Sequence, residues 1–155
     1  ADTAVDHESD KHEKGDHHMS TDIRAAQKAV EAFMAAGGQT TRIVPEVPDP
    51  PIAGRRIERL REEVEELEDA VADIDIVEYA DAIADIIYVA LGAAVEAGID
   101  IEPVIEEVID SNNSKIDWQS AQPWARHGNG KIAKTERYSP PNIAPILERQ
   151  GLING

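Results

Sequence analysis

The 155-residue chain is acidic and aliphatic, which limits both its fold and its partners. It has 31 Asp and Glu against 15 Lys and Arg, a net charge of −16, and only 4% aromatic residues. This charge disfavours binding to nucleic acid or to anionic membranes. The chain has no cysteine, which excludes disulfides, thiolate metal sites and a cysteine nucleophile. The length suits one domain, and the longest apolar run, residues 86–95, is too short to span a bilayer.

Residues 1–18 are polar, acidic and rich in histidine, with four of the five His of the chain. We interpret them as a solvated tail, with a metal-binding tail as the alternative. The start of the chain contains no apolar segment, so we expect no signal peptide. The domain itself is expected over residues 19–155.

Periodicity predicts an all-α fold that begins with three helices. The first starts at Ser20 or Thr21 and ends at the glycine pair 37–38. Four prolines make residues 39–53 an extended connector. The second helix runs from about residue 54 to residue 74, with an apolar stripe along one face. The third, residues 76–97, is apolar nearly all round, so we expect it to be the most buried element.

A fourth helix is expected to start at Asp100 or Glu102, with a proline in its first turn. The face of this helix that we expect to be buried includes Val108 and continues to Asn112 and Lys115. These two polar residues are therefore expected on an extension of the buried face. The chain becomes irregular from residue 116, and a short final helix is expected over residues 143–150. No sustained alternation of apolar and polar residues occurs, so no strand is predicted. We therefore expect a bundle of four to five helices.

Acidic residues gather on two of these helices. The third helix carries Glu78, Asp81 and Asp85 on one face, at spacings i, i+3 and i+7. The second carries another cluster: Glu62, Glu63, Glu65 and Glu66. Carboxylates placed together in apolar surroundings are unfavourable unless a cation neutralises them, and no basic residue lies between residues 74 and 114.

These clusters predict a site for a hard divalent cation, most consistent with magnesium, held between the two helices. A salt-bridge network with the arginines of residues 55–61 is the alternative. An EF-hand is disfavoured because no glycine occupies its tight-turn position, and zinc is disfavoured because cysteine is absent.

Four segments together resemble the MazG-like, all-α nucleoside triphosphate pyrophosphohydrolases: LREEVEELEDAV, VEYADAIADIIYVALGAAVEAGID, SNNSK and GKIAKTERYSPPNI. The nearest group is the phosphoribosyl-ATP pyrophosphohydrolase-like one common in bacteriophages, and the resemblance covers residues 20–150. It implies an EExxE…ExxD magnesium site with the ligands Glu63, Glu66, Glu78 and Asp81. Glu62 or Glu63 would orient the attacking water or accept its proton. The stretch between Glu66 and Glu78 is short, so a tight turn is expected around Ile74.

The resemblance also implies the reaction and the remaining site residues. A triphosphate is cleaved between its α- and β-phosphates, with two or more Mg²⁺ ions, or Mn²⁺ as a substitute. The phosphate- and sugar-binding residues are then Asn112, Lys115, Lys131, Lys134 and Tyr138, although SNNSK departs from the more usual SNMSK. The base-binding candidates are Phe33, Gln39 and Trp118. A homodimer or homotetramer is expected because the third helix is more apolar than a monomer can cover.

Several functions remain open from the sequence. The resemblance implies dGTP or GTP as the preferred substrate. The enzyme is expected in the cytoplasm, which is the bacterial host cytoplasm if the chain is phage-encoded. The enzymatic alternatives are hydrolysis of phosphoribosyl-ATP, of dUTP or of another deoxynucleotide. The non-enzymatic alternative is an acidic helical interaction module, which would tolerate charge-neutral substitutions at Glu63 and Asp81.

Overall fold

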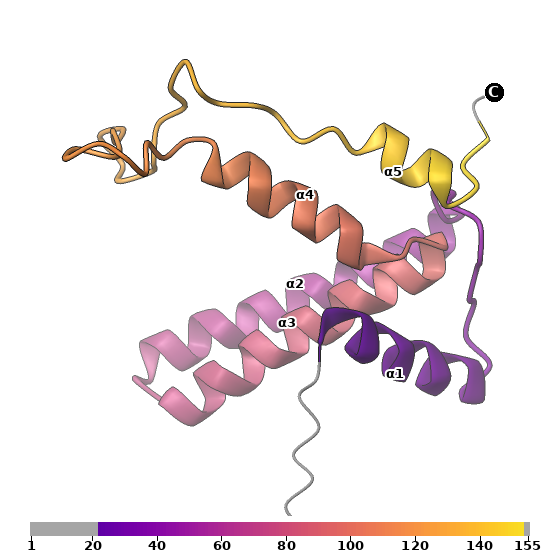
Figure 1. The fold of residues 1–155 in the computed structure, drawn as a ribbon. Helices are drawn as coiled ribbons and strands as arrows, with labels where there is room; N and C mark the ends of the chain where they lie inside the picture. The colour runs from indigo at the N-terminus through magenta and orange to yellow at the C-terminus, as the bar shows by residue number, and fades with distance from the viewer. Residues whose placement is uncertain (1–21, 154–155) are drawn as a thin grey trace, which may run out of the picture.

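The computed structural model describes residues 22–153, which form five α-helices and one isolated bridge between Arg126 and Ile132 (Figure 1). The helices are α1 (Ile23–Ala36), α2 (Pro50–Ala72), α3 (Ile76–Ala97), α4 (Ile101–Asn113) and α5 (Ala144–Arg149). The all-α prediction is therefore confirmed. The predicted tail and the predicted caps Ser20 and Thr21 lie outside the described residues. The first helix is capped by Asp22, whose side chain accepts the N–H of Ala25.

A long antiparallel hairpin of α2 and α3 is the centre of the fold (Figure 1). The helix α2 begins at Pro50, four residues before the predicted start. Proline suits the first turn of a helix, where its missing N–H needs no partner. The turn between the helices is tight, as predicted, with Ile74 at a φ of 55°. The Asp75 side chain then starts α3 by accepting the N–H groups of Val77 and Glu78.

The core lies where α1 packs against the second half of α3. Val30 and Met34 of α1 pack there against Leu91 and Val95 of α3. Among the described helices α3 has the most buried residues, as predicted, and all of them except Ala82 lie in its second half. The first half of the helix is mostly exposed.

A buried ion pair ties α2 to α3 beside this core. Arg56 donates to Oε1 of Glu96 at 2.6 Å, and its guanidinium lies 3.8 Å from Sδ of Met34. Gly92 makes room for this guanidinium, because a Cβ there would overlap it. The Nε of Arg56 and the Oε2 of Glu96 are buried without a hydrogen-bond partner.

The connector between α1 and α2 is hydrogen-bonded to the carboxyl end of α3. The N–H of Arg42 donates to the carbonyl of Val95 at 3.1 Å, and the N–H of Glu46 donates to that of Ala97 at 2.9 Å. Gly98, with a φ of 68°, permits this approach, because a Cβ would strike the backbone of Val44. Residues 39–49 contain neither helix nor strand, whereas residues 50–53 of the predicted connector belong to α2.

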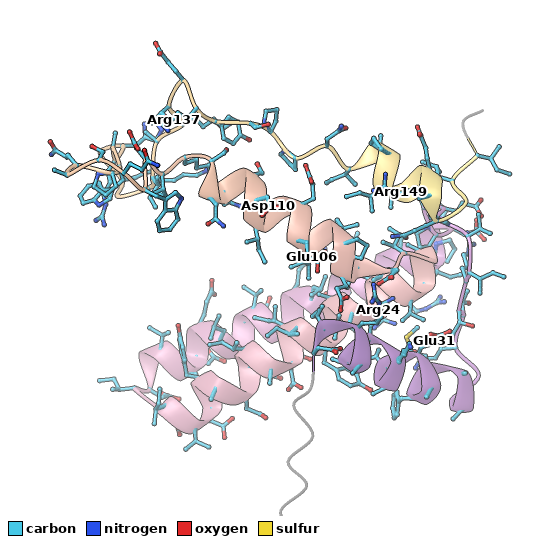
Figure 2. The ribbon with its side chains drawn as sticks, viewed as in Figure 1. Arg24, Glu31, Glu106, Asp110, Arg137 and Arg149 are labelled. Atoms are coloured by element: carbon cyan, nitrogen blue, oxygen red, sulfur yellow. The ribbon has the colours of Figure 1, made fainter. Side chains whose placement is uncertain are left out.

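The helix α4 leaves the hairpin and packs on α1 (Figure 1). Arg24 of α1, labelled in Figure 2, pairs with Asp100 and Glu102 at the start of α4, with N···O distances of 3.0 and 2.8 Å. No single described helix is long and apolar enough to cross a membrane, whereas α3 and α4, bent by 118°, meet the length and composition criteria as a pair.

The prediction that Asn112 and Lys115 extend the buried face of α4 is wrong. Ser111 is the buried residue there, and its hydroxyl donates to the carbonyl of Ser139 at 2.9 Å. Asn112 is exposed and Lys115 is half-buried. The returning C-terminal segment packs beside Ser111, one position away from the predicted line.

Candidate functional site

Three carboxylates from two helices meet on the α2–α3 hairpin. Oxygen atoms of Glu63, Glu66 and Asp85 all lie within 4.8 Å of one another. Glu63 and Glu66 are one turn apart on α2, and Asp85 faces them from α3. The antiparallel hairpin explains this meeting, because Glu63 is ten residues before Asp73 and Asp85 is ten residues after Asp75.

The cluster is electrostatically unfavourable without a cation. Glu63 is only 8% exposed, and its burial raises the pKa of its carboxyl group, which Glu66 and Asp85 raise further. Arg59 opposes this shift and lowers the pKa. Three hard oxygen donors in a partly buried setting match the ligands that Mg²⁺ and Mn²⁺ prefer, so the donor set fits a divalent cation.

The structure brings together two of the four predicted metal ligands, Glu63 and Glu66, and adds Asp85. Glu78 and Asp81 are exposed on α3 and are not members of this group of three. Asp81 lies one turn nearer the hairpin tip than Asp85, about 6 Å along the axis, and Glu78 lies about 10 Å from Asp85. Both stay predictions. The signal for Asp85 was its place on the same acidic face.

A cavity of about 390 Å³ opens beside the carboxylates. Glu63 and Asp85 line it together with Phe33 and Gln39, two of the residues predicted to bind the base. The sequence interpretation missed Tyr88, whose ring meets that of Phe33 edge-on at 6.1 Å and 75°. Tyr88 follows Asp85 by three residues, and this spacing was the signal for a shared face.

Four of the five residues predicted to bind phosphate or sugar form a second cluster at the end of α4 and in the segment that follows it. Lys115 donates to the side-chain oxygen of Asn112 at 2.8 Å. The ammonium groups of Lys115 and Lys134 lie 5.7 and 4.6 Å from the centre of the Tyr138 ring. Each lysine is thus placed for a cation–π contact with the same tyrosine.

The segment that follows α4 carries Lys115, Lys134 and Tyr138 of this lysine cluster, and it lies apart from the α2–α3 hairpin in Figure 1. In the same segment Arg137, labelled in Figure 2, pairs with Asp117 at 3.2 Å. Lys131 lies in a separate turn, where its N–H donates to Asn129. Trp118 donates to the carbonyl of Asn113 and does not line the cavity beside Phe33.

Together, the fold and the site define an all-α protein whose helical hairpin carries carboxylates suited to a divalent cation. Residues 30–112 match the family model of phosphoribosyl-ATP pyrophosphohydrolase, and the chain belongs to this family. The matched region includes the whole hairpin and its three carboxylates. No curated protein matches the chain. Membership of the family indicates pyrophosphohydrolase activity in general, with a metal ion as cofactor.

Proposed function

We propose that the chain is a magnesium-dependent pyrophosphohydrolase that converts a nucleoside or deoxynucleoside triphosphate to the monophosphate and pyrophosphate. The main supporting observation is the position of Glu63 and Asp85 at the wall of a partly apolar cavity. Such a cavity suits a base, and the carboxylates beside it suit a cation that binds the triphosphate. The catalytic domain spans residues 19–155, of which 30–112 match the family model.

Each acidic residue has a role in this proposal. A bound Mg²⁺, or Mn²⁺ in its place, would neutralise the triphosphate and lower the pKa of a water. Glu63, Glu66 and Asp85 would hold one ion. Asp81 and Glu78, nearer the hairpin tip, would supply ligands for a second ion. Glu62, next to Glu63, orients the attacking water or accepts its proton.

The phosphates are assigned to the lysine cluster. Lys115 and Lys134 supply positive charge, while Asn112 and Tyr138 fix the positions of these two ammonium groups. Lys131 and Trp118 lie outside the cluster. We assign Lys131 a secondary contact to phosphate and Trp118 a secondary contact to the base.

The proposed substrate is dGTP or GTP. Phe33 and Tyr88 offer aromatic surface to a purine, and Gln39 offers an amide to its polar edge. The second candidate is phosphoribosyl-ATP, which the description of the matching family model favours. Hydrolysis of dUTP or another deoxynucleotide is the third.

We also propose that the protein is a homodimer or homotetramer. Large apolar side chains of the hairpin are exposed in the single chain, including Val71 at 60%, Val77 at 70% and Ile87 at 50%. Large apolar side chains exposed in this number on two helices are typical of a subunit interface.

One experiment tests the reaction. The full-length protein is incubated with each of the eight common nucleoside triphosphates, with phosphoribosyl-ATP and with Mg²⁺ or Mn²⁺, and the products are separated. We expect monophosphate and pyrophosphate without orthophosphate, and loss of both in Glu63→Gln. Accumulation of a diphosphate would place cleavage at the terminal phosphate, and no turnover of any substrate would favour the interaction module.

A further inference from the structure

A single ion pair connects the two helices that carry the clustered carboxylates. In the described part of the chain, no other ion pair or side-chain hydrogen bond than that of Arg56 with Glu96 joins α2 to α3. The N···O distance is 2.6 Å, and the two side chains are 11% and 9% exposed. The carboxylates of Glu63 and Asp85 repel each other across the same helices. The pair is therefore the directional side-chain contact that can set how α2 lies on α3.

The pair and the carboxylates lie along the same contact between the helices. Arg56 precedes Glu63 by seven residues, which is close to two turns of α2 or about 10 Å. Glu96 follows Asp85 by eleven residues, close to three turns of α3 or about 16 Å. Side chains separated by whole turns share a helix face, and Arg56, Glu63 and Asp85 line one cavity. The carboxylates thus lie between two fixed points, the turn at Ile74 and the ion pair.

Gly92 of α3 is fitted to the guanidinium of Arg56. A Cβ at this position would overlap the guanidinium, and Gly92 is buried within the helix. Its φ is not positive, so the backbone conformation does not require glycine there. Because glycine is less favourable than alanine inside a helix, the room that it leaves for Arg56 explains its presence.

The pair is better suited to positioning than to stability. Burial removes the hydration of both charges, so a buried ion pair adds little stability compared with apolar side chains of similar size. The Nε of Arg56 and the Oε2 of Glu96 have no hydrogen-bond partner, which lowers that contribution further. Both residues also line a second cavity, of about 350 Å³, so apolar packing does not fill the space beside them. The best-attested use of such buried polar contacts is to fix the alignment of helices.

We propose that Arg56 and Glu96 are positioning residues, which align α2 on α3 so that the three clustered carboxylates bind a divalent cation. The inference rests on the metal site of the proposed function and adds to it two residues that do not bind the cation. Loss of residues that orient metal ligands typically lowers metal affinity by about 10- to 100-fold. Without the pair the protein should stay folded, bind the cation more weakly and recover turnover at high Mg²⁺ concentration.

The test measures binding of Mn²⁺ to the full-length protein without nucleotide. The double variant Arg56→Met with Glu96→Leu replaces the pair by apolar side chains of similar size. We expect its melting temperature to hold or rise and its Kd for Mn²⁺ to increase about 10-fold or more. Glu63→Gln identifies the specific site, because binding that this variant fully retains belongs to other acidic residues. Unchanged Mn²⁺ affinity in the folded double variant would overturn the proposal.

A second variant keeps both charges and covers the case in which the double variant does not fold. Gly92→Ala displaces the guanidinium of Arg56 by one methyl group. Gly54→Ala is the matched control, because Gly54 also lies in a helix and a Cβ there would meet no atom within 4 Å. We expect Gly92→Ala to raise the Kd for Mn²⁺ about 10-fold and Gly54→Ala to leave it unchanged. Equal Kd values for these two variants would contradict the positioning role.

Kinetics separate failure of this inference from failure of the proposed function. With a triphosphate that the wild type cleaves, the double variant should need about 10-fold more Mg²⁺ for half-maximal turnover and reach a kcat close to that of the wild type. A kcat that stays low at saturating Mg²⁺ would overturn the positioning role and leave the reaction in place. Weaker Mn²⁺ binding by the variants, without any turnover by the wild type, would support the positioning role and refute the reaction. A wild type that binds no Mn²⁺ would refute both.

Discussion

Glu63 of α2 and Asp85 of α3 place carboxylate oxygens within 4.8 Å of each other across the helical hairpin. Neither helix holds the site alone, so its geometry depends on how the two helices align. The Arg56–Glu96 ion pair joins the same helices farther from the turn. A change that slides α2 along α3 would therefore separate Glu63 from Asp85.

Replacement of Asp85 by Asn tests its role as a ligand, which the acidic face of α3 indicated but the EExxE…ExxD pattern did not include. We expect turnover to fall about 100-fold or more, because one charged contact to the reacting group is lost. The metal-free melting temperature should hold or rise, since repulsion among the three carboxylates is relieved. Asp69→Asn, on the exposed face of α2, is the control. An Asp85→Asn protein with full activity would remove this residue from the site.

Asp81 and Glu78 test whether a second ion binds nearer the hairpin tip. We expect Asp81→Asn to lower turnover about 100-fold and Glu78→Gln also to reduce it, by loss of ligand charge. Because the three clustered carboxylates remain, higher Mg²⁺ concentration should restore part of the activity. Mg²⁺ titrations of both variants measure this. Wild-type curves for both would restrict the metal site to Glu63, Glu66 and Asp85.

The stability of the metal-free protein should depend on pH through Glu63. Its pKa is raised in the folded state by burial and by neighbouring carboxylates. Between the ordinary value, about 4.3, and the raised one, the native state holds more protons than the unfolded state. The free energy of unfolding therefore falls as pH rises through this window. Since Glu63→Gln lacks this titration, the melting temperature of wild type minus that of the variant should decrease with pH. A constant difference would contradict the raised pKa.

The assembly and the lysine cluster can be tested together. We expect light scattering at micromolar concentration to give a dimer or tetramer, since the exposed apolar side chains of the hairpin need cover. The lysine cluster lies apart from the hairpin in one chain (Figure 1), so we expect a second subunit to supply it. Co-refolded Glu63→Gln and Lys115→Met, each inactive alone, should then recover activity. A monomer, or no recovery, would contradict this arrangement.

Ile74 should limit stability at the hairpin turn. It is 92% exposed and adopts a φ of 55°, which is unfavourable for a β-branched residue by about 1–2 kcal/mol. Asn tolerates this conformation, so Ile74→Asn should raise the melting temperature by about 2–4 °C. Thermal denaturation checks this, and a lower value would show that Ile74 makes an apolar contact between subunits.

The sequence was sufficient to predict the helices and the turn that neighbouring residues determine. Apolar periodicity located the α2–α3 hairpin, and the short link between Glu66 and Glu78 predicted its tight turn. The start of α2 was missed because the proline pair at residues 50–51 is compatible both with an extended connector and with a first helical turn.

The partners of each site residue depend on tertiary packing, which periodicity does not fix. Asp85 and Glu78 share a helix face, but only the alignment of the hairpin decides which of them meets Glu63. The burial of Ser111 instead of Asn112 depends on the C-terminal segment, whose irregular sequence carries no periodic signal. Tyr88 acquires a role only through a cavity built from several elements.

The hydrogen bonds from the connector to the carboxyl end of α3 divide the second cavity between two bodies. Gly38 and Gln39 are hydrogen-bonded to the end of α1 and Glu96 belongs to α3, whereas Arg55 and Arg59 belong to α2. A small rotation of α2 against α3 would move Arg55 and Arg59 relative to the connector, and it would also disturb the Arg56–Glu96 ion pair that lines the same cavity. The shape of this cavity therefore depends on the residues packed between the two helices.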